Sequence, residues 1–184
     1  MMKRIVVKIG GSVLVLAAYL FLWPVPIEPV AWSAPKDLGY VGAFAPNDVL
    51  DDIEPASLDG FTGPEDAAFG SDGRLYLATH EGVIITYDPT SGDVSEFADT
   101  GGRPLGLEFD DNGTLFVADA YRGLLAVTPN GTVKVLADDV VGDSAIAYAD
   151  DVDIAPDGSV YFTDASTKFG PKNLVILWQV HFLI

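Results

Sequence analysis

Two pairs of adjacent carboxylates precede strand-like runs in this chain. Glu65 and Asp66 follow a proline and precede an apolar stretch, and Asp150 and Asp151 precede a similar stretch. Carboxylate oxygens suit the binding of a hard divalent cation and the activation of water by a general base. They also end turns and stay in solvent. From the residues alone, both explanations of the Glu65–Asp66 pair remain open.

Composition restricts the metal sites and partners that the chain can have. The 184 residues include no cysteine, and the two histidines are His80 and His181. A thiolate zinc site is therefore excluded, and a tightly held metal would be bound by oxygen, which favours calcium or magnesium. We assign no residues to an organic cofactor. A net charge of -17, with 27 acidic against 10 basic residues, argues against a nucleic-acid partner and also suits a solvated surface.

The N-terminal residues 1–23 form a membrane-directed segment, with Lys3, Arg4 and Lys8 before an apolar run. We expect a signal-anchor, a transmembrane helix whose basic end is cytoplasmic, so that the rest of the protein lies on the non-cytoplasmic side. Secretion after signal cleavage is the alternative, although 31–34 is only an approximate cleavage site. Residues 24–37 are rich in proline, which predicts an extended linker.

From residue 38 to residue 170 the pattern is all-β and repeats. Gly73, Gly113 and Gly158 each follow Asp or Asn, are separated by 40 and 45 residues, and each precedes a strand-like run. Three strands follow each of the first two apolar runs, which makes four strands per repeat and is typical of a β-propeller blade. The strands we predict include 75–78, 83–87, 115–118, 124–127, 133–136 and 160–163.

Residues 38–170 provide about three blades, whereas propellers close with about four to eight. The apolar segment 171–184 abandons the repeat. We expect a truncated or frame-shifted gene product, and an amphiphilic tail is the alternative. A partial propeller would expose open blade edges, which predicts oligomerisation or aggregation.

Four stretches in the chain resemble a known family. GPEDAAF, TGGRPLGLEFD, LFVADAYRGLLAV and DDVDIAPDGSVYFTDASTKFG are similar to the strictosidine synthase-like proteins and the related gluconolactonase and regucalcin group, including a membrane-anchored branch. The resemblance implies a six-bladed β-propeller with a central divalent cation, usually calcium. Esters or lactones are the substrates of the hydrolytic members.

The resemblance also assigns roles to particular residues. Glu65 matches a glutamate ligand of the metal, and Asp150 stands where the family usually has a metal-binding asparagine. An aspartate there can also bind calcium but adds a negative charge. Asp151 is the candidate catalytic residue, as a general base or as a partner that supports a ligand. The family's other metal ligands would come after residue 184.

Three further residues fall in repeated motifs. We expect Arg103 to pair with a buried carboxylate. Asp119 and Asp164 follow equivalent strands, so we predict that they make hydrogen bonds in turns or between blades. The two Asn-Gly-Thr stretches fit a glycosylation sequon, but a tight hairpin turn explains them.

These observations lead to a membrane-anchored, calcium-dependent hydrolase of esters or lactones as the expected function. A non-catalytic propeller that binds a partner or has a structural role at the membrane is the alternative. A third expectation is that this 184-residue chain is itself an inactive fragment.

Overall fold

The computed structural model of the protein describes residues 2–22, 30–140, 145–166 and 170. The chain forms two compact units, Met1–Asp52 and Ile53–Ile184. The predicted apolar tail, 171–184, and residues 24–29 of the predicted linker lie outside the described residues.

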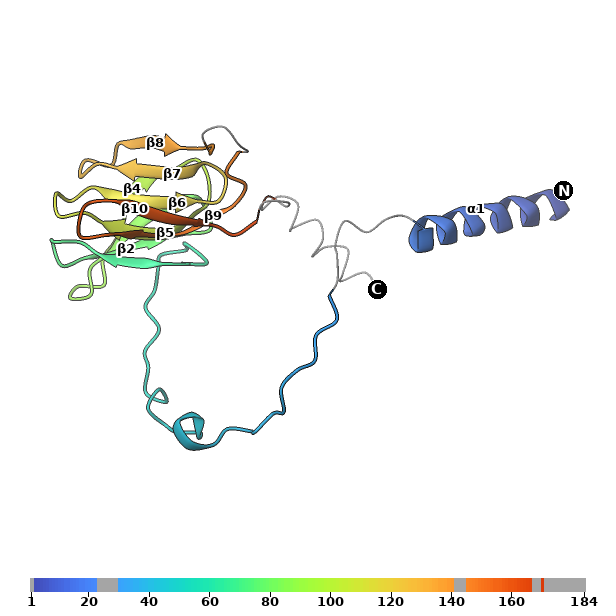
Figure 1. Ribbon diagram of the computed structural model, residues 1–184, viewed down its shortest axis with the longest axis horizontal. Helices are drawn as coiled ribbons and strands as arrows, with labels where there is room; N and C mark the ends of the chain where they lie inside the picture. The colour runs from blue at the N-terminus through green and yellow to red at the C-terminus, as the bar shows by residue number, and fades with distance from the viewer. Residues whose placement is uncertain (1, 23–29, 141–144, 167–169, 171–184) are drawn as a thin grey trace. The chain divides into compact units, whose positions relative to one another are not determined.

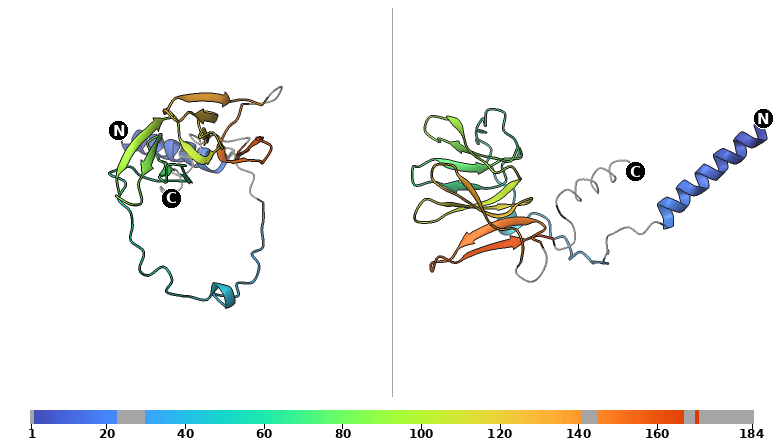
Figure 2. Two further views of the ribbon diagram at one scale, coloured as in Figure 1. Left: turned by 90° about the vertical axis from the view of Figure 1, so that its left-hand side faces the viewer. Right: turned by 90° about the horizontal axis from the view of Figure 1, so that it is seen from above.

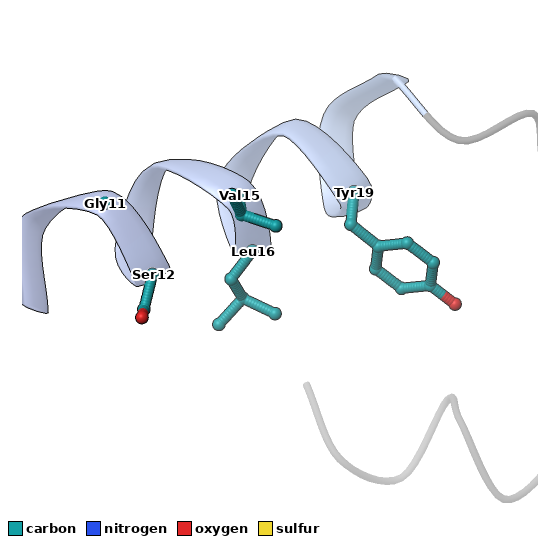
Figure 3. Close-up of a pocket in the computed structure, with 5 residues that line it drawn as sticks. All are labelled: Gly11, Ser12, Val15, Leu16 and Tyr19. Atoms are coloured by element: carbon teal, nitrogen blue, oxygen red, sulfur yellow. The ribbon is translucent and has the colours of Figure 1, made fainter. Parts of the chain in front are cut away.

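The first unit contains the helix α1 (Met2–Leu22) and the short 3-10 helix η1 (Gly42–Phe44). Five residues of α1 lie along one side of the helix, as Figure 3 shows: Gly11, Ser12, Val15, Leu16 and Tyr19. In the part of the chain that the structure describes, no helix is long and apolar enough to cross a membrane. The transmembrane helix that we predicted over residues 1–23 is therefore not confirmed.

The second unit consists of antiparallel sheets (Figure 1). The first sheet has the order β1 (Ala67–Phe69), β2 (Leu75–Ala78), β3 (Val83–Tyr87) and β4 (Val94–Asp99). The second has the order β5 (Pro104–Phe109), β6 (Leu115–Asp119), β7 (Gly123–Val127) and β8 (Val133–Ala137). The third pairs β9 (Ala149–Ile154) with β10 (Val160–Asp164).

The turn between the first two strands of each sheet has the same geometry. Gly73, Gly113 and Gly158 have φ angles of 81°, 81° and 85°, which residues with a side chain rarely adopt. The N–H of each glycine donates to the carbonyl oxygen three residues earlier, at 3.0, 3.0 and 2.8 Å. These angles and hydrogen bonds confirm the predicted tight hairpins. The sequence could predict them because the geometry of a hairpin turn depends on residues that are adjacent in the chain.

Apolar side chains fill the space between successive sheets. Ile84 of β3 and Leu115 and Val117 of β6 belong to one cluster of buried residues, and all three are 0% exposed. A smaller cluster joins Ala118 and Leu124 of the second sheet to Val152 of the third. Each sheet thus covers a face of the next one, and Figure 2 shows the sheets following one another in chain order.

The fold agrees with the predicted pattern of strands. All six predicted runs coincide with β2, β3, β6, β7, β8 and β10 to within one residue at either end. The first two sheets have the predicted four strands, and the third has two described strands. The first strands of the sheets are neighbours, with β1 in contact with β5 and β5 in contact with β9. This arrangement brings the starts of three equivalent strands together.

Candidate functional site

Both predicted carboxylate pairs line one cavity of about 290 Å³. Its lining consists of Glu65, Asp66, Leu105, Gly106, Asp150 and Asp151. Glu65, Leu105 and Asp150 are separated by the same 40 and 45 residues as the three turn glycines. Each sheet therefore contributes the same two positions of the repeat to the cavity.

Hydrogen bonds to β2 fix the backbone of Glu65 just before β1. The Glu65 N–H donates to the carbonyl oxygen of Ala78 at 3.0 Å, and the Ala78 N–H donates to the carbonyl oxygen of Asp66 at 3.1 Å. The Glu65 side chain keeps 58% of its surface exposed. A carboxylate on a fixed backbone with open access to solvent is suited to binding a cation.

Arg103 is the charged partner of Glu65. Its Nη2 atom lies 3.7 Å from Glu65 Oε2 and donates a hydrogen bond of 3.3 Å to the carbonyl oxygen of Gly63. Its Nη1 atom is buried and has no hydrogen-bond partner among the described residues. The prediction of a buried carboxylate partner for the Arg103 side chain was wrong, because that partner is largely exposed. Such a partly solvated ion pair contributes at most about 1 kcal/mol, so it orients Glu65 more than it stabilises the fold.

The Arg103 backbone does contact a buried carboxylate, that of Asp119. Asp119 is 0% exposed, and its Oδ1 atom accepts hydrogen bonds from the N–H groups of Arg103, Tyr121 and Arg122 at 3.0, 2.9 and 3.1 Å. Its Oδ2 atom accepts one from the Thr100 hydroxyl at 2.8 Å. The predicted hydrogen-bonding role of Asp119 is confirmed, and it holds the segment that carries Arg103.

Gly106 brings the second and third sheets into close contact. A Cβ atom at Gly106 would lie 2.7 Å from the Cα atom of Asp151 and 3.0 Å from the carbonyl oxygen of Asp150. Real Cβ atoms almost never approach backbone that closely. The absence of a side chain therefore permits the two strands to place Asp150 and Asp151 at the cavity. Our sequence analysis missed Leu105 and Gly106, although the repeat interval could have identified them.

The carboxylate of Asp151 accepts a hydrogen bond at one of its two oxygen atoms. Its Oδ1 atom accepts a hydrogen bond of 2.9 Å from the Val152 N–H, and its own N–H donates to the Thr163 hydroxyl at 3.1 Å. Its side chain is exposed. The carboxylate thus has a fixed orientation, and its catalytic role remains a prediction.

The carboxylates around the cavity affect the titration of their neighbours. Burial raises the pKa of Glu108, and the negative charges of Asp153, Asp66 and Asp151 raise it further. Burial likewise raises the pKa of Tyr148, with added contributions from Asp150 and Glu65 that Arg103 opposes. The contributions of the cavity carboxylates Glu65, Asp66, Asp150 and Asp151 to these shifts indicate a negative potential at the cavity, which favours a cation over an anion.

The oxygen atoms of Glu65 and Asp150 fit a hard divalent cation in their chemistry but provide only part of its coordination. Calcium takes about six to eight oxygen ligands. Among the described residues, no group of three or more His, Cys, Asp or Glu side chains is arranged to hold a metal ion. The metal-binding roles of Glu65 and Asp150 therefore remain predictions.

Comparison with known proteins supports the family resemblance. The family model described as "Strictosidine synthase-like, N-terminal" matches residues 42–87. The adipocyte plasma membrane-associated protein of Salmo salar is 35% identical over an alignment of 192 positions that covers 95% of this chain and 46% of the relative. The strictosidine synthase-like protein 3 of Arabidopsis thaliana is 32% identical over 152 residues, which cover 70% of this chain and 39% of the relative. The chain therefore spans less than half the length of these relatives.

Among solved structures, the chain is similar to a gluconolactonase from Xanthomonas campestris. The TM-score is 0.53 at 21% sequence identity, and the match covers 58% of this chain and 36% of that chain. At this identity the likeness shows the fold alone, the propeller architecture of antiparallel sheets.

Proposed function

Because this chain belongs to the strictosidine synthase-like family, we propose that it contributes to a calcium-dependent hydrolase of esters or lactones. The observation that carries the proposal is the cavity of about 290 Å³ at which Glu65, Asp150 and Asp151 converge from different sheets. The gluconolactonase activity named for the solved structure suggests a lactone as the first substrate to test.

The residues of the cavity have separate tasks in this proposal. Glu65 and Asp150 would hold the cation, which would supply Lewis-acid polarisation of a carbonyl group. Asp151 takes a proton from the attacking water with the carboxylate oxygen that the Val152 N–H does not occupy. Arg103 orients Glu65 from 3.7 Å. Leu105 provides an apolar wall beside the reacting group.

Hydrolysis by the purified full chain tests this proposal. We expect turnover of an aryl acetate and of a gluconolactone in calcium, loss of turnover with a chelator, and a decrease of at least about tenfold in Glu65→Gln. Activity that is equal with and without chelator would refute the role of the cation. Absence of turnover by this chain at saturating calcium would support the expectation that it is an inactive fragment, whereas absence of turnover by a full-length relative would refute the hydrolase.

The second function is a non-catalytic propeller, and the observation that supports it is that Glu65 and Asp150 line one cavity from different sheets. In this case a cation would brace the sheets. Calcium would then raise the unfolding temperature of the chain without any turnover of esters or lactones, and the same two measurements separate the two functions.

Membrane association through residues 1–23 completes the proposal. The basic residues at the start of this segment and the name of the Salmo salar relative support it, with the sheets on the non-cytoplasmic side. Expression of a tagged full chain, followed by membrane fractionation and protease protection, tests the association. Recovery in the medium after cleavage near residues 31–34 would instead support secretion.

A further inference from the structure

We propose that Asp66 is a positioning residue that ties the first two sheets together and thereby places Glu65 at the cavity. The part of this inference that concerns the cation rests on the proposed function. The tie between the sheets stands on geometry alone and can be tested separately.

Both oxygen atoms of Asp66 are occupied by backbone N–H groups. Oδ1 accepts a hydrogen bond of 2.8 Å from the N–H of Ala67 in β1, and Oδ2 accepts one of 2.8 Å from the N–H of Leu107 in β5. These bonds join the first strands of two different sheets. Asp66 lines the cavity, and both of its carboxylate oxygens accept hydrogen bonds from backbone N–H groups, so the side chain holds the backbone of two strands.

At the other described junction between sheets, the equivalent position makes a different contact. Gly106 has no side chain, and the backbone of β9 occupies the space where its Cβ atom would lie. Asp151 makes the same local bond as Asp66, from its Oδ1 atom to the next N–H, at 2.9 Å. The first and second sheets are thus joined through the Asp66 carboxylate, and the second and third sheets through direct backbone contact at Gly106.

The position of Asp66 connects the tie to the candidate cation site. Glu65 is its covalent neighbour, and Leu107 lies two residues after Leu105, which also lines the cavity. If the bond to Leu107 is lost, β1 and β5 can separate, and Glu65 changes its distance from Asp150. Residues that orient metal ligands typically change metal affinity by about 10–100-fold when they are mutated.

The test uses the full chain and three variants, Asp66→Ala, Asp66→Asn and Asp110→Ala. Asp110 is a matched control, because its Oδ1 atom accepts hydrogen bonds from the N–H groups of Asn112 and Thr114 at 2.9 and 2.7 Å in a hairpin turn away from the cavity. Titration calorimetry gives the calcium Kd, and hydrogen exchange by NMR reports on the Leu107 amide.

We expect Asp66→Ala to weaken calcium binding by about 10–100-fold and to accelerate exchange of the Leu107 amide. Asp66→Asn removes the same charge but retains one acceptor oxygen, so its loss of calcium affinity should be smaller. This variant replaces Asp66→Ala in the test if Asp66→Ala does not fold. Asp110→Ala should leave the calcium Kd and the Leu107 amide within about twofold of the wild type.

Two results would overturn the inference. If the exchange rate of the Leu107 amide is unchanged in both Asp66 variants, Asp66 does not tie the two sheets together. Equal losses of calcium affinity in Asp66→Ala and Asp66→Asn would show that charge alone acts on the cation. If the wild-type chain binds no calcium, the proposed function fails, and the tie is then judged by the Leu107 amide.

Discussion

Replacing the buried Asp119 with alanine should destabilise the chain strongly. The carboxylate accepts hydrogen bonds from three backbone N–H groups and from the Thr100 hydroxyl, and it is 0% exposed. Alanine would leave these donors unsatisfied in a site closed to water. A buried donor left unsatisfied costs about 1–3 kcal/mol, so the loss of several such bonds is a large part of the total stability of about 5–15 kcal/mol of a typical protein.

Asp164 is the matched control for this prediction, because it occupies the equivalent position of the third sheet. Its carboxylate accepts hydrogen bonds from the N–H groups of Ala147, Tyr148 and Ser166 at 3.0, 2.9 and 3.3 Å, but it is exposed. Water can replace its carboxylate in Asp164→Ala, so we expect a loss of about 1 kcal/mol.

Urea unfolding of the wild type, Asp119→Ala and Asp164→Ala measures both losses through the midpoint and the slope of the transition. Equal losses in the two variants would refute the reasoning, because the predicted difference comes from burial and not from the number of hydrogen bonds. A loss below about 1 kcal/mol in Asp119→Ala would refute it as well.

Two further predictions concern the junction of the sheets and the dependence of stability on pH. Gly106→Ala should cost about 1–3 kcal/mol in urea unfolding, because its Cβ atom would lie 2.7 Å from the Cα atom of Asp151; no loss would mean that the strands can separate freely. Glu81 accepts hydrogen bonds from the Thr62 hydroxyl and N–H, which lower its pKa from 4.5 to about 2. The stabilisation of the folded state by the ionised Glu81 is fully present above pH 4.5 and is lost as the pH falls through about 2. The unfolding temperature of Glu81→Gln should therefore be lower than that of the wild type at pH 7 and converge with it toward pH 2; a difference that is constant with pH would contradict the assignment.

Glu65 and Asp150 were predicted from the family resemblance, and the regular interval of the repeat explains why the structure brings them to one cavity. Glu65 and Asp150 occupy equivalent positions, so a fold that stacks its repeats brings them to the same end of neighbouring strands. Leu105 and Gly106 lie at the same positions but were overlooked, because neither an apolar side chain nor a glycine suggests chemistry. The Arg103 side chain could not be assigned to Glu65, since that contact joins residues 38 positions apart through an irregular segment.

The sequence by itself determined the strands, their hairpin turns and the repeat, because these depend on alternation and on glycines at positive φ within a few residues. Only the tertiary structure decided which carboxylates are buried and which backbone N–H groups they bind. Asp119 is enclosed by the segment that joins the first and second sheets, whereas Asp164 ends the last described sheet and is exposed. Asp66 and Asp151 make the same local bond to the next N–H, and the second bond of Asp66, to Leu107 of the next sheet, depends on how the first two sheets pack. The physical reason is that burial and contacts between sheets depend on how neighbouring sheets pack, which no local pattern specifies.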